Sequence, residues 1–427
     1  LEAEKIKNNV RTERGEKIRD WYKLEEIVQS EETLDTHHRE IAFTYLSTIT
    51  GRTFEEVKRA YERFAAKPDK NNNLFHVIYW LGKVAMEEEA QKKDRAISFS
   101  PILRERIGHH IYGERWAKRI KQTLLDAGLI RRPLHIISAN LHSVMNCLYA
   151  FGALKSSPLQ GKTLEQLAIE LSKSENAPLM ERIEQYAEQH GMIYLRENSG
   201  THISTQIFDT TKIDFTTLPP EIPFDITYLQ KEQPVIFLMD YAFGEQAYET
   251  MDELLKPFTT EEGEKIKLNV QSISIMGKAG ILYGGKGDLM IPTAHVFEGT
   301  ADNYPFENAF RKEDFEGFGL NVYEGPMITV LGTSLQNKDV LTFFRNTSWN
   351  AIGLEMEGAH YQKAIQAASR IRNNIRKDVV LRYAYYASDN PLVTGSTLAS
   401  GSLGLIGVKP TYLITQKILE RIFMGNK

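Results

Sequence analysis

The feature that most constrains the fold is a change of hydrophobic pattern near residue 131. From there onward, short β-rich runs alternate with segments of helical periodicity, and several of those runs are almost continuously apolar. Such runs are typical of strands in a sheet that helices cover on both faces. We therefore expect one α/β domain over residues 131–427. The predicted strands are Leu134–Ser138, Ile193–Leu195, Val235–Met239, Ser272–Met276, Leu289–Pro292, Met327–Leu331, Ala351–Leu354 and Val379–Ala387.

The first 130 residues have a different pattern, which is helical and rich in charge. Apolar residues recur there at three- and four-residue spacing, as in Val57, Ala60, Tyr61 and Phe64, which is typical of the buried face of an amphipathic helix. This pattern predicts a helical accessory domain over residues 1–130, outside the catalytic core.

Composition excludes several classes of protein. The formal net charge of −4 gives no general affinity for polyanions, so we expect no nucleic-acid partner. Cys147 is the single cysteine, which permits no disulfide within the chain and no cysteine-based zinc cluster and fits a reducing compartment. No signal peptide and no run of ~18 apolar residues is visible, so the expected location is the cytoplasm, with no membrane partner.

Ligands of open α/β sheets bind beyond the carboxyl ends of the strands. We therefore examined the segments that follow the predicted strands, and five of them are polar, acidic or rich in glycine. These are Ala139–Ser143, Asp240–Glu245, Gly277–Gly280, Glu355–Ala359 and Ser388–Pro391. Each is a common type of loop on its own, but five together indicate a site.

Two acidic positions carry the most specific chemistry. Asp389 follows a long β-rich run, and a partly desolvated carboxyl there can keep its proton near neutral pH and act as a general acid. The alternative is that Ser388 or Asp389 caps the next turn or helix. Glu355 and Glu357 share one face if the chain is extended there, and a carboxylate suits the vicinal hydroxyls of a ribose. The alternative for Glu357 is an acidic residue in the first turn of a helix.

The glycine-rich segments are less specific. Gly277–Gly280 predicts a turn in which the backbone approaches a ligand closely. Gly284–Asp288 predicts a tight turn into the next strand. The sequence contains no P-loop, no G-x-G-x-x-G fingerprint after a strand and no His or acidic cluster with metal-ligand spacing. We therefore expect neither a metal nor another cofactor.

These motifs, taken in order, resemble those of the nucleoside phosphorylase superfamily. Its central signature is a strand, a glycine turn and a G-D-x-hydrophobic strand, followed by an E-M-E-x-A element and a late S-D element, which in AMP nucleosidases has the form S-D-x-P-L. The matching segments are Ser272–Leu282, Lys286–Pro292, Glu298–Thr300, Gly353–Ala359, Ala387–Leu392 and, more loosely, Val235–Ala247.

The resemblance implies a mixed sheet covered by helices and a nucleosidase-type hydrolase that cleaves the N-glycosidic bond of a purine nucleoside or nucleotide. Asp389 would donate a proton or hydrogen bond to purine N7, and Glu357 would hold the ribose hydroxyls. The other residues that it implies at the substrate are Glu355, Met356 beneath the sugar, Ala279 and Gly280 along the base or ribose, and Ser388 in support of Asp389. A homo-oligomer is implied as well.

The departures from the family pattern leave alternatives open. Ala139–Ser143 and Asp240–Ala247 contain no Arg or Lys, which favours water over phosphate as the acceptor, and a phosphorylase is the alternative. Lys278 is unusual within the glycine segment; it either binds a substrate 5′-phosphate or forms an ion pair with Glu355 or Glu357, and we favour the ion pair.

The loop after Val235–Met239 lacks the usual G-x-G. This leaves Gly244, Glu245 and His142 as candidates for the region around the nucleophilic water. A catalytically inactive, nucleotide-binding regulatory module is the alternative from a different functional class.

Overall fold

The structure is a computed structural model, and it describes residues 2–30, 34–64, 74–91, 110–157, 159, 161–298, 300–332, 337–393 and 403–425. Gly299, within the Glu298–Thr300 motif, lies outside these residues. The chain divides into two compact units, and each is described by itself. No helix in the described part of the chain is both long and apolar enough to cross a lipid bilayer.

The first unit is helical. Aromatic side chains dominate its core: Trp21 stacks on Tyr79, and Phe43 stacks on Phe75. The Tyr79 hydroxyl donates to Glu25 at 2.6 Å, so α2 and α5 are joined by both packing and a hydrogen bond. The helices are α1 (Glu2–Asn9), α2 (Arg19–Gln29), α3 (Thr36–Thr50), α4 (Phe54–Phe64) and α5 (Leu74–Gln91).

The second unit is a mixed α/β domain. A π-helical turn (Ala367–Ile371) continues helix α14 (Gly358–Gln366). The helices are α7 (His110–Asp126), α8 (Leu141–Ala153), α9 (Leu164–Leu171), α10 (Ala177–Gln189), α11 (Ile226–Glu232), α12 (Gln246–Leu255), α13 (Lys338–Asn346), α14 (Gly358–Gln366) and α15 (Val408–Phe423). The strands are β1 (Leu134–Ser138), β2 (Met192–Leu195), β3 (Thr205–Asp209), β4 (Val235–Met239), β5 (Phe258–Thr259), β6 (Lys265–Ile266), β7 (Val270–Ile281), β8 (Leu289–Phe297), β9 (Asn303–Pro305), β10 (Val322–Thr329), β11 (Gly353–Glu355) and β12 (Val380–Asp389).

One ten-stranded sheet organises this domain. Its order is β11-β10-β8-β12-β7-β1-β4-β3-β2, with β9 beside β8. The neighbours β12, β7, β1 and β4 run parallel, so their carboxyl ends lie along one edge. Strand β11 also pairs with β7 in the antiparallel sense, so the path β7-β12-β8-β10-β11 closes on itself.

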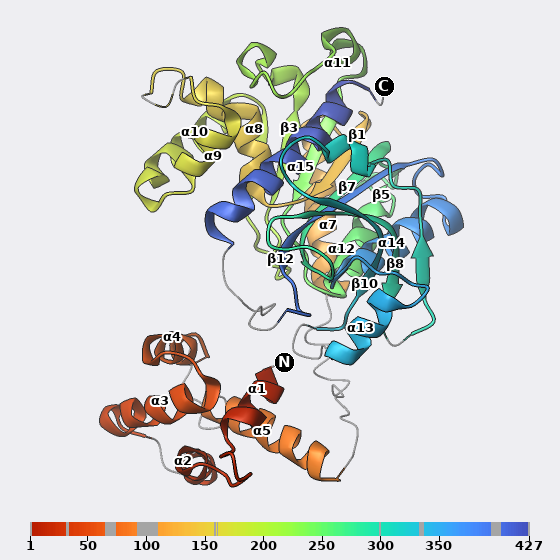
Figure 1. Cartoon of the computed structure of the whole chain (residues 1–427). Helices are drawn as coiled ribbons and strands as arrows, with labels where there is room; N and C mark the ends of the chain where they lie inside the picture. The colour runs from red at the N-terminus through yellow and green to blue at the C-terminus, as the bar shows by residue number, and fades with distance from the viewer. Residues whose placement is uncertain are drawn as a thin grey trace. The chain divides into compact units, whose positions relative to one another are not determined.

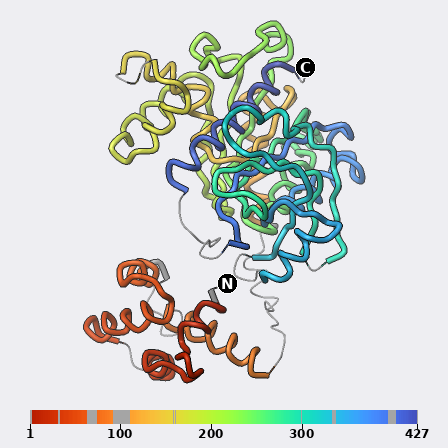
Figure 2. The backbone as a smooth tube through the Cα atoms, in the orientation of Figure 1, coloured from red at the N-terminus to blue at the C-terminus, as the bar shows by residue number. Residues whose placement is uncertain are grey.

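Helices cover both faces of the sheet, as Figure 1 shows and as the backbone tube in Figure 2 allows the reader to follow. One face packs against α8, α9, α10 and α15 around a core that includes Met276 and Ala384. The other packs against α7, α12 and α14 around a core that includes Ile275 and Tyr383. Because α7 packs on the sheet through Trp116, the helices predicted before residue 131 are shared between the two units.

The predicted strands agree closely with the observed ones. β1 and β4 have the predicted bounds, and β7 and β8 extend beyond them, whereas β10, β11 and β12 overlap the predicted ranges with shifted ends. β3 (Thr205–Asp209) was not predicted, because its Thr, Gln and Asp residues hide the apolar pattern although every residue is buried. Gly284–Asp288 forms the predicted turn, in which Asp288 accepts from the Gly285 amide at 2.9 Å.

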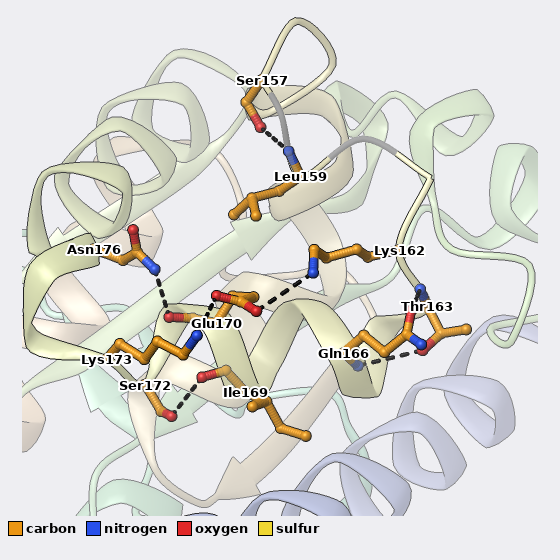
Figure 3. Close-up of polar contacts among 10 residues, drawn as sticks. All are labelled: Ser157, Leu159, Lys162, Thr163, Gln166, Ile169, Glu170, Ser172, Lys173 and Asn176. Carbon is orange, nitrogen blue, oxygen red and sulfur yellow. Dashed lines mark hydrogen bonds and ion pairs between the residues drawn. The ribbon is translucent and has the colours of Figure 1, made fainter.

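Helix α9 is fixed at both ends by short-range polar contacts (Figure 3). Thr163 caps its start: the hydroxyl accepts from the Gln166 amide, and the Gln166 side chain accepts from the Thr163 amide. At the other end, the side-chain amide of Asn176 donates to the backbone carbonyl of Glu170 at 2.8 Å. Both contacts satisfy backbone groups that a helix leaves without partners at its ends.

We expect Thr163→Ala to lower the free energy of unfolding by about 1 kcal/mol, because it removes this N-cap. Urea titration would measure the change. Thr342→Ala is the matched control, since the Thr342 hydroxyl donates to the Lys338 carbonyl within helix α13 and caps neither end of that helix, and we expect a loss within ~0.5 kcal/mol. Equal losses in the two variants would contradict the capping role.

Candidate active site

The candidate site lies where β7 extends past the end of β1. Ser138, the last residue of β1, pairs with Ile275, and β7 continues to Ile281. Beyond that point β11 pairs with β7, with Leu354 opposite Gly280. The end of β11 therefore points back toward the ends of β1 and β4, which gathers the predicted strand-end segments at one edge of the sheet.

The predicted turn at Gly277–Gly280 is wrong, because this segment belongs to strand β7. Its four residues pair in order with Tyr385–Asp389 of β12, across a bulge at Ser388. Gly277 is needed for packing: a Cβ there would lie 2.6 Å from the Tyr385 ring. Ala279 belongs to the buried core on the face of the sheet that packs against α7, α12 and α14, and its place along the base or ribose stays a prediction.

Asp389 is the last residue of β12, and its side chain is 0% exposed. Oδ1 accepts from the Ser388 hydroxyl at 2.5 Å, and that hydroxyl also contacts the Ala279 carbonyl at 3.0 Å. Oδ2 has no hydrogen-bond partner among the described residues. Burial raises the pKa of Asp389, although the Ser388 hydroxyl opposes the rise. The turn after the strand is stabilised instead by Asn390, which accepts from the Leu392 amide.

Glu355 is buried and stabilises the first turn of α14. One carboxylate oxygen contacts the Thr329 hydroxyl, and the other accepts from the amides of Glu357, at 2.6 Å, and Gly358. Burial and then the neighbouring Glu357 carboxylate raise the pKa of Glu355 to about 8. The acidic side chain that stabilises the start of this helix is therefore Glu355, whereas such a role was considered above for Glu357.

Glu357 is half-buried at the start of α14 and does not cap its own helix. Its Oε1 accepts from the Gly244 amide at 2.9 Å. Burial raises the pKa of Glu357, and the Gly244 and Met356 amides oppose the rise. Gly244 thus lies beside Glu357, in a left-handed conformation with φ of 58°. Met356 is half-buried and packs with the apolar cluster around Leu354.

Two further predicted residues, His142 and Glu245, lie near the loop that follows β4. His142 is exposed in the first turn of α8, and it lies within electrostatic range of Asp240. Glu245 is exposed just before α12 and interacts electrostatically with His360, whose pKa burial lowers to about 4. Both residues therefore lie near the loop that follows β4.

Lys278 lies on the opposite face of the sheet from Glu355. Alternate residues of a strand share a face, and Gly280 stands opposite Leu354, so Lys278 lies on the face of Leu354. Lys278 is exposed and forms no ion pair with Glu355 or Glu357, so the ion pair that we favoured is absent. Its charge acts on Asp389, as does that of Lys286.

Two polar groups of this edge were not among the predicted site residues. Asp240 directly follows β4, and burial raises its pKa. Lys286 stands in the turn before β8, which is joined to the end of β12 because the Gly287 amide donates to the Ala387 carbonyl. The position of Asp240 after a buried strand is a signal that sequence alone contains, whereas the position of Lys286 depends on a contact about 100 residues away in the chain.

No group of three or more His, Cys, Asp or Glu side chains in the described part of the chain could hold a metal ion. The chemical groups gathered at this edge are five carboxyls, two lysines and His142, and burial raises the pKa of four of the carboxyls, those of Asp240, Glu355, Glu357 and Asp389. Carboxyl groups with raised pKa values, placed together at strand ends, are suited to proton transfer and to binding hydroxyl groups.

The sequence profile of a protein family, described as a family of unknown function (DUF6909), matches residues 168–424. The chain belongs to this family. The match begins in α9 and includes every strand from β2 to β12. No curated protein matches the chain.

Several solved structures are similar. Futalosine hydrolase of Helicobacter pylori is 12% identical, with 68% of this chain and 97% of that chain covered and a TM-score of 0.37. The 5′-methylthioadenosine/S-adenosylhomocysteine nucleosidase of Campylobacter jejuni is 11% identical, with 68% and 99% covered and a TM-score of 0.37. AMP nucleosidase of Bacteroides thetaiotaomicron is 13% identical, with 71% and 98% covered and a TM-score of 0.34.

We expect Gly277→Ala to lower the free energy of unfolding by about 1–3 kcal/mol, because the added methyl group overlaps the buried Tyr385 ring. Gly285→Ala is the control, since a Cβ at that position meets nothing within 4 Å. Thermal and urea unfolding would compare the two variants. An unchanged stability in Gly277→Ala, with weakened ligand binding, would restore the interpretation of this glycine as a point of ligand approach.

Proposed function

We propose that the α/β domain is a nucleosidase of the nucleoside-phosphorylase type that hydrolyses the N-glycosidic bond of a purine nucleotide or nucleoside. The observation that carries the proposal is Asp389. Its carboxyl is fully buried, its pKa is raised, and one oxygen has no hydrogen-bond partner among the described residues. A raised pKa favours the protonated carboxyl, whose proton can be donated to a leaving base.

The sugar-binding part of the proposal rests on Glu357. Asp389 and Leu354 stand on either side of Gly280, so the two outer strands are about 10 Å apart at this point. Glu357 follows Leu354 by three residues. A ligand with a base at Asp389 and vicinal hydroxyls at Glu357 would therefore cross the end of β7.

In the proposed reaction, Asp389 is the acid and water is the acceptor of the sugar. The bond between C1′ and the base nitrogen breaks, and its electron pair leaves with the base, which takes a proton at N7 from Asp389. The sugar becomes oxocarbenium-like, and the Glu357 carboxylate accepts hydrogen bonds from its hydroxyls. Water adds to C1′ and gives its proton to a carboxylate of the β4 loop, Asp240 or Glu245.

Lys278 and Lys286 favour a substrate that carries phosphate. Both are exposed, act on Asp389 electrostatically and form no ion pair with the described residues. Cations without carboxylate partners beside a ligand site attract anions. We therefore expect nucleoside 5′-monophosphates to be better substrates than nucleosides. The same lysines would also suit inorganic phosphate as the acceptor, which is the phosphorylase alternative.

The first test is free-base release from AMP, IMP, GMP, adenosine, inosine, guanosine and 5′-methylthioadenosine, each with and without phosphate. Release without phosphate supports a nucleosidase. Release only with phosphate favours a phosphorylase, and binding without release favours the inactive regulatory module. Homo-oligomerisation stays a prediction, which light scattering of the same preparation would measure.

We expect Asp389→Asn to lower kcat/KM about 10²–10⁴-fold, because an amide can donate a hydrogen bond but cannot transfer its proton to the base. In the unmodified protein, activity should fall as the pH rises through the pKa of Asp389, since only the protonated carboxyl is an acid. Because burial raises that pKa, the active range should extend above the usual range of an aspartate. Asp378→Asn is the control, because Asp378 is an exposed aspartate in the turn before the amino end of the same strand. Equal activities in both variants would exclude Asp389 as the acid.

We expect Lys278→Gln to raise KM for a nucleoside 5′-monophosphate roughly tenfold, which corresponds to about 1.4 kcal/mol, and to leave KM for the matching nucleoside nearly unchanged. Lys377→Gln is the control, because Lys377 is an exposed lysine in the turn before β12. Steady-state kinetics on both substrates would measure the ratio. A similar change for nucleotide and nucleoside would contradict a role in binding phosphate.

A further inference from the structure

The first turn of α14 is held by two buried side chains from neighbouring strands. Thr329 ends β10 and Glu355 ends β11, and the two residues stand opposite each other in the parallel register. Their side chains are in hydrogen-bond contact. Thr329 is 1% exposed and Glu355 is 4% exposed, so the contact is shielded from water.

These two side chains accept hydrogen bonds from three consecutive amides. Glu355 accepts from Glu357 and Gly358, and the Thr329 hydroxyl accepts from Ala359 at 3.1 Å. The first amides of a helix have no partner within the helix. The Thr329–Glu355 pair therefore satisfies all three of these amides, at a point where solvent does not reach.

The consequence for Glu357 is that its side chain is not used for capping. Residues at the start of a helix commonly turn their side chain back to their own helix, but the Glu357 side chain makes no such cap. Its carboxylate points to another segment and accepts from the Gly244 amide. The backbone of Glu357 is fixed while its carboxylate is directed toward the β4 loop.

Packing beneath the turn leaves no room for a shift. A Cβ on Gly358 would lie 2.3 Å from the His295 ring and 2.8 Å from the Tyr385 hydroxyl. His295 and Tyr385 are themselves buried and in contact at 3.2 Å. The first turn of α14 is therefore fixed by hydrogen bonds from Glu355 and Thr329 and by close packing against His295 and Tyr385.

We propose that Thr329 and Glu355 are positioning residues that orient the Glu357 carboxylate toward the sugar hydroxyls of the substrate. This inference rests on the proposed function, because it assumes that Glu357 binds a sugar. A displacement of about 1 Å in such a group is enough to weaken a hydrogen bond that the substrate needs. Loss of the Thr329 hydroxyl should thus reduce selectivity for ribose, which a purely structural contact would not do.

Three variants would test the proposal. Thr329→Val keeps the shape and removes the hydroxyl, whereas Thr329→Ser keeps the hydroxyl. Thr210→Val is the matched control: Thr210 is 3% exposed, and its hydroxyl donates to the Pro234 carbonyl at 2.5 Å at the amino end of β4. All variants would carry Asp389→Asn, so that bound substrate is not consumed.

Two measurements on the full chain give the answer. Amide hydrogen exchange at Gly358 and Ala359 reports whether the turn is held. Calorimetry with the pairs AMP and 2′-deoxy-AMP, and IMP and 2′-deoxy-IMP, reports selectivity for the 2′-hydroxyl. We expect faster exchange and a roughly tenfold smaller ribose preference in Thr329→Val only, with values close to the parent in Thr329→Ser and Thr210→Val.

The outcomes separate this inference from the proposed function. Unchanged exchange in Thr329→Val would overturn the inference, as would faster exchange with an unchanged ribose preference. A parent protein that binds none of the four nucleotides would overturn it too, since there would be no sugar to orient. If the protein with Asp389 intact releases no base, the proposed function fails, while the binding ratios still decide the positioning role.

Discussion

The arrangement of the site depends on one constraint of backbone pairing, which is the excess length of β7. β7 has twelve residues and its parallel neighbour β1 has five. Past the end of β1, the buried amides and carbonyls of β7 need another partner, because a buried polar group without one costs about 1–3 kcal/mol. The antiparallel β11 supplies that partner, with Gly353 opposite Ile281. A Cβ on Gly353 would lie 2.7 Å from the Gly280 carbonyl. Because glycine has no Cβ, the backbones of β11 and β7 can approach each other here.

This pairing also determines which charges meet. β12 pairs with the other side of β7 through the same residue, Gly280, and so Asp389 and the end of β11 flank one point. Burial then raises the pKa values of Glu355, Glu357 and Asp389. Glu355 and Glu357 would repel each other as two anions, and they can coexist when one of them holds a proton. Burial thus shifts all three carboxyls toward the protonated form, and it does so most for Glu355, whose pKa rises to about 8.

Much of the fold and part of the site could be predicted from sequence. The apolar runs of β1 and β4 mark their bounds, since each is buried along its whole length. The rule that ligands bind at strand ends selected the segments around Asp389 and Glu357, which do lie along one edge. Gly277 was misinterpreted because the side chain that requires a glycine at this position, the Tyr385 ring, is more than 100 residues away in the sequence. The capping role of Glu355 was missed for the same cause, since it requires Thr329 of another strand.

The position of Asp389 within a strand bears on the chemistry. A carboxyl in a turn would be wetter and would move with its loop, whereas Asp389 ends a ten-residue strand whose residues 382–387 are all buried. The bulge at Ser388 breaks the alternation of side chains, so that the single Ser388 hydroxyl lies within hydrogen-bond distance of both the Ala279 carbonyl and Oδ1 of Asp389. One oxygen of Asp389 is thereby fixed by the protein, and the other is the oxygen that can hold the proton. A strand end with a bulge can thus give a single carboxyl both a fixed orientation and a raised pKa. A general acid requires both properties, whereas a carboxyl that only caps a turn requires neither.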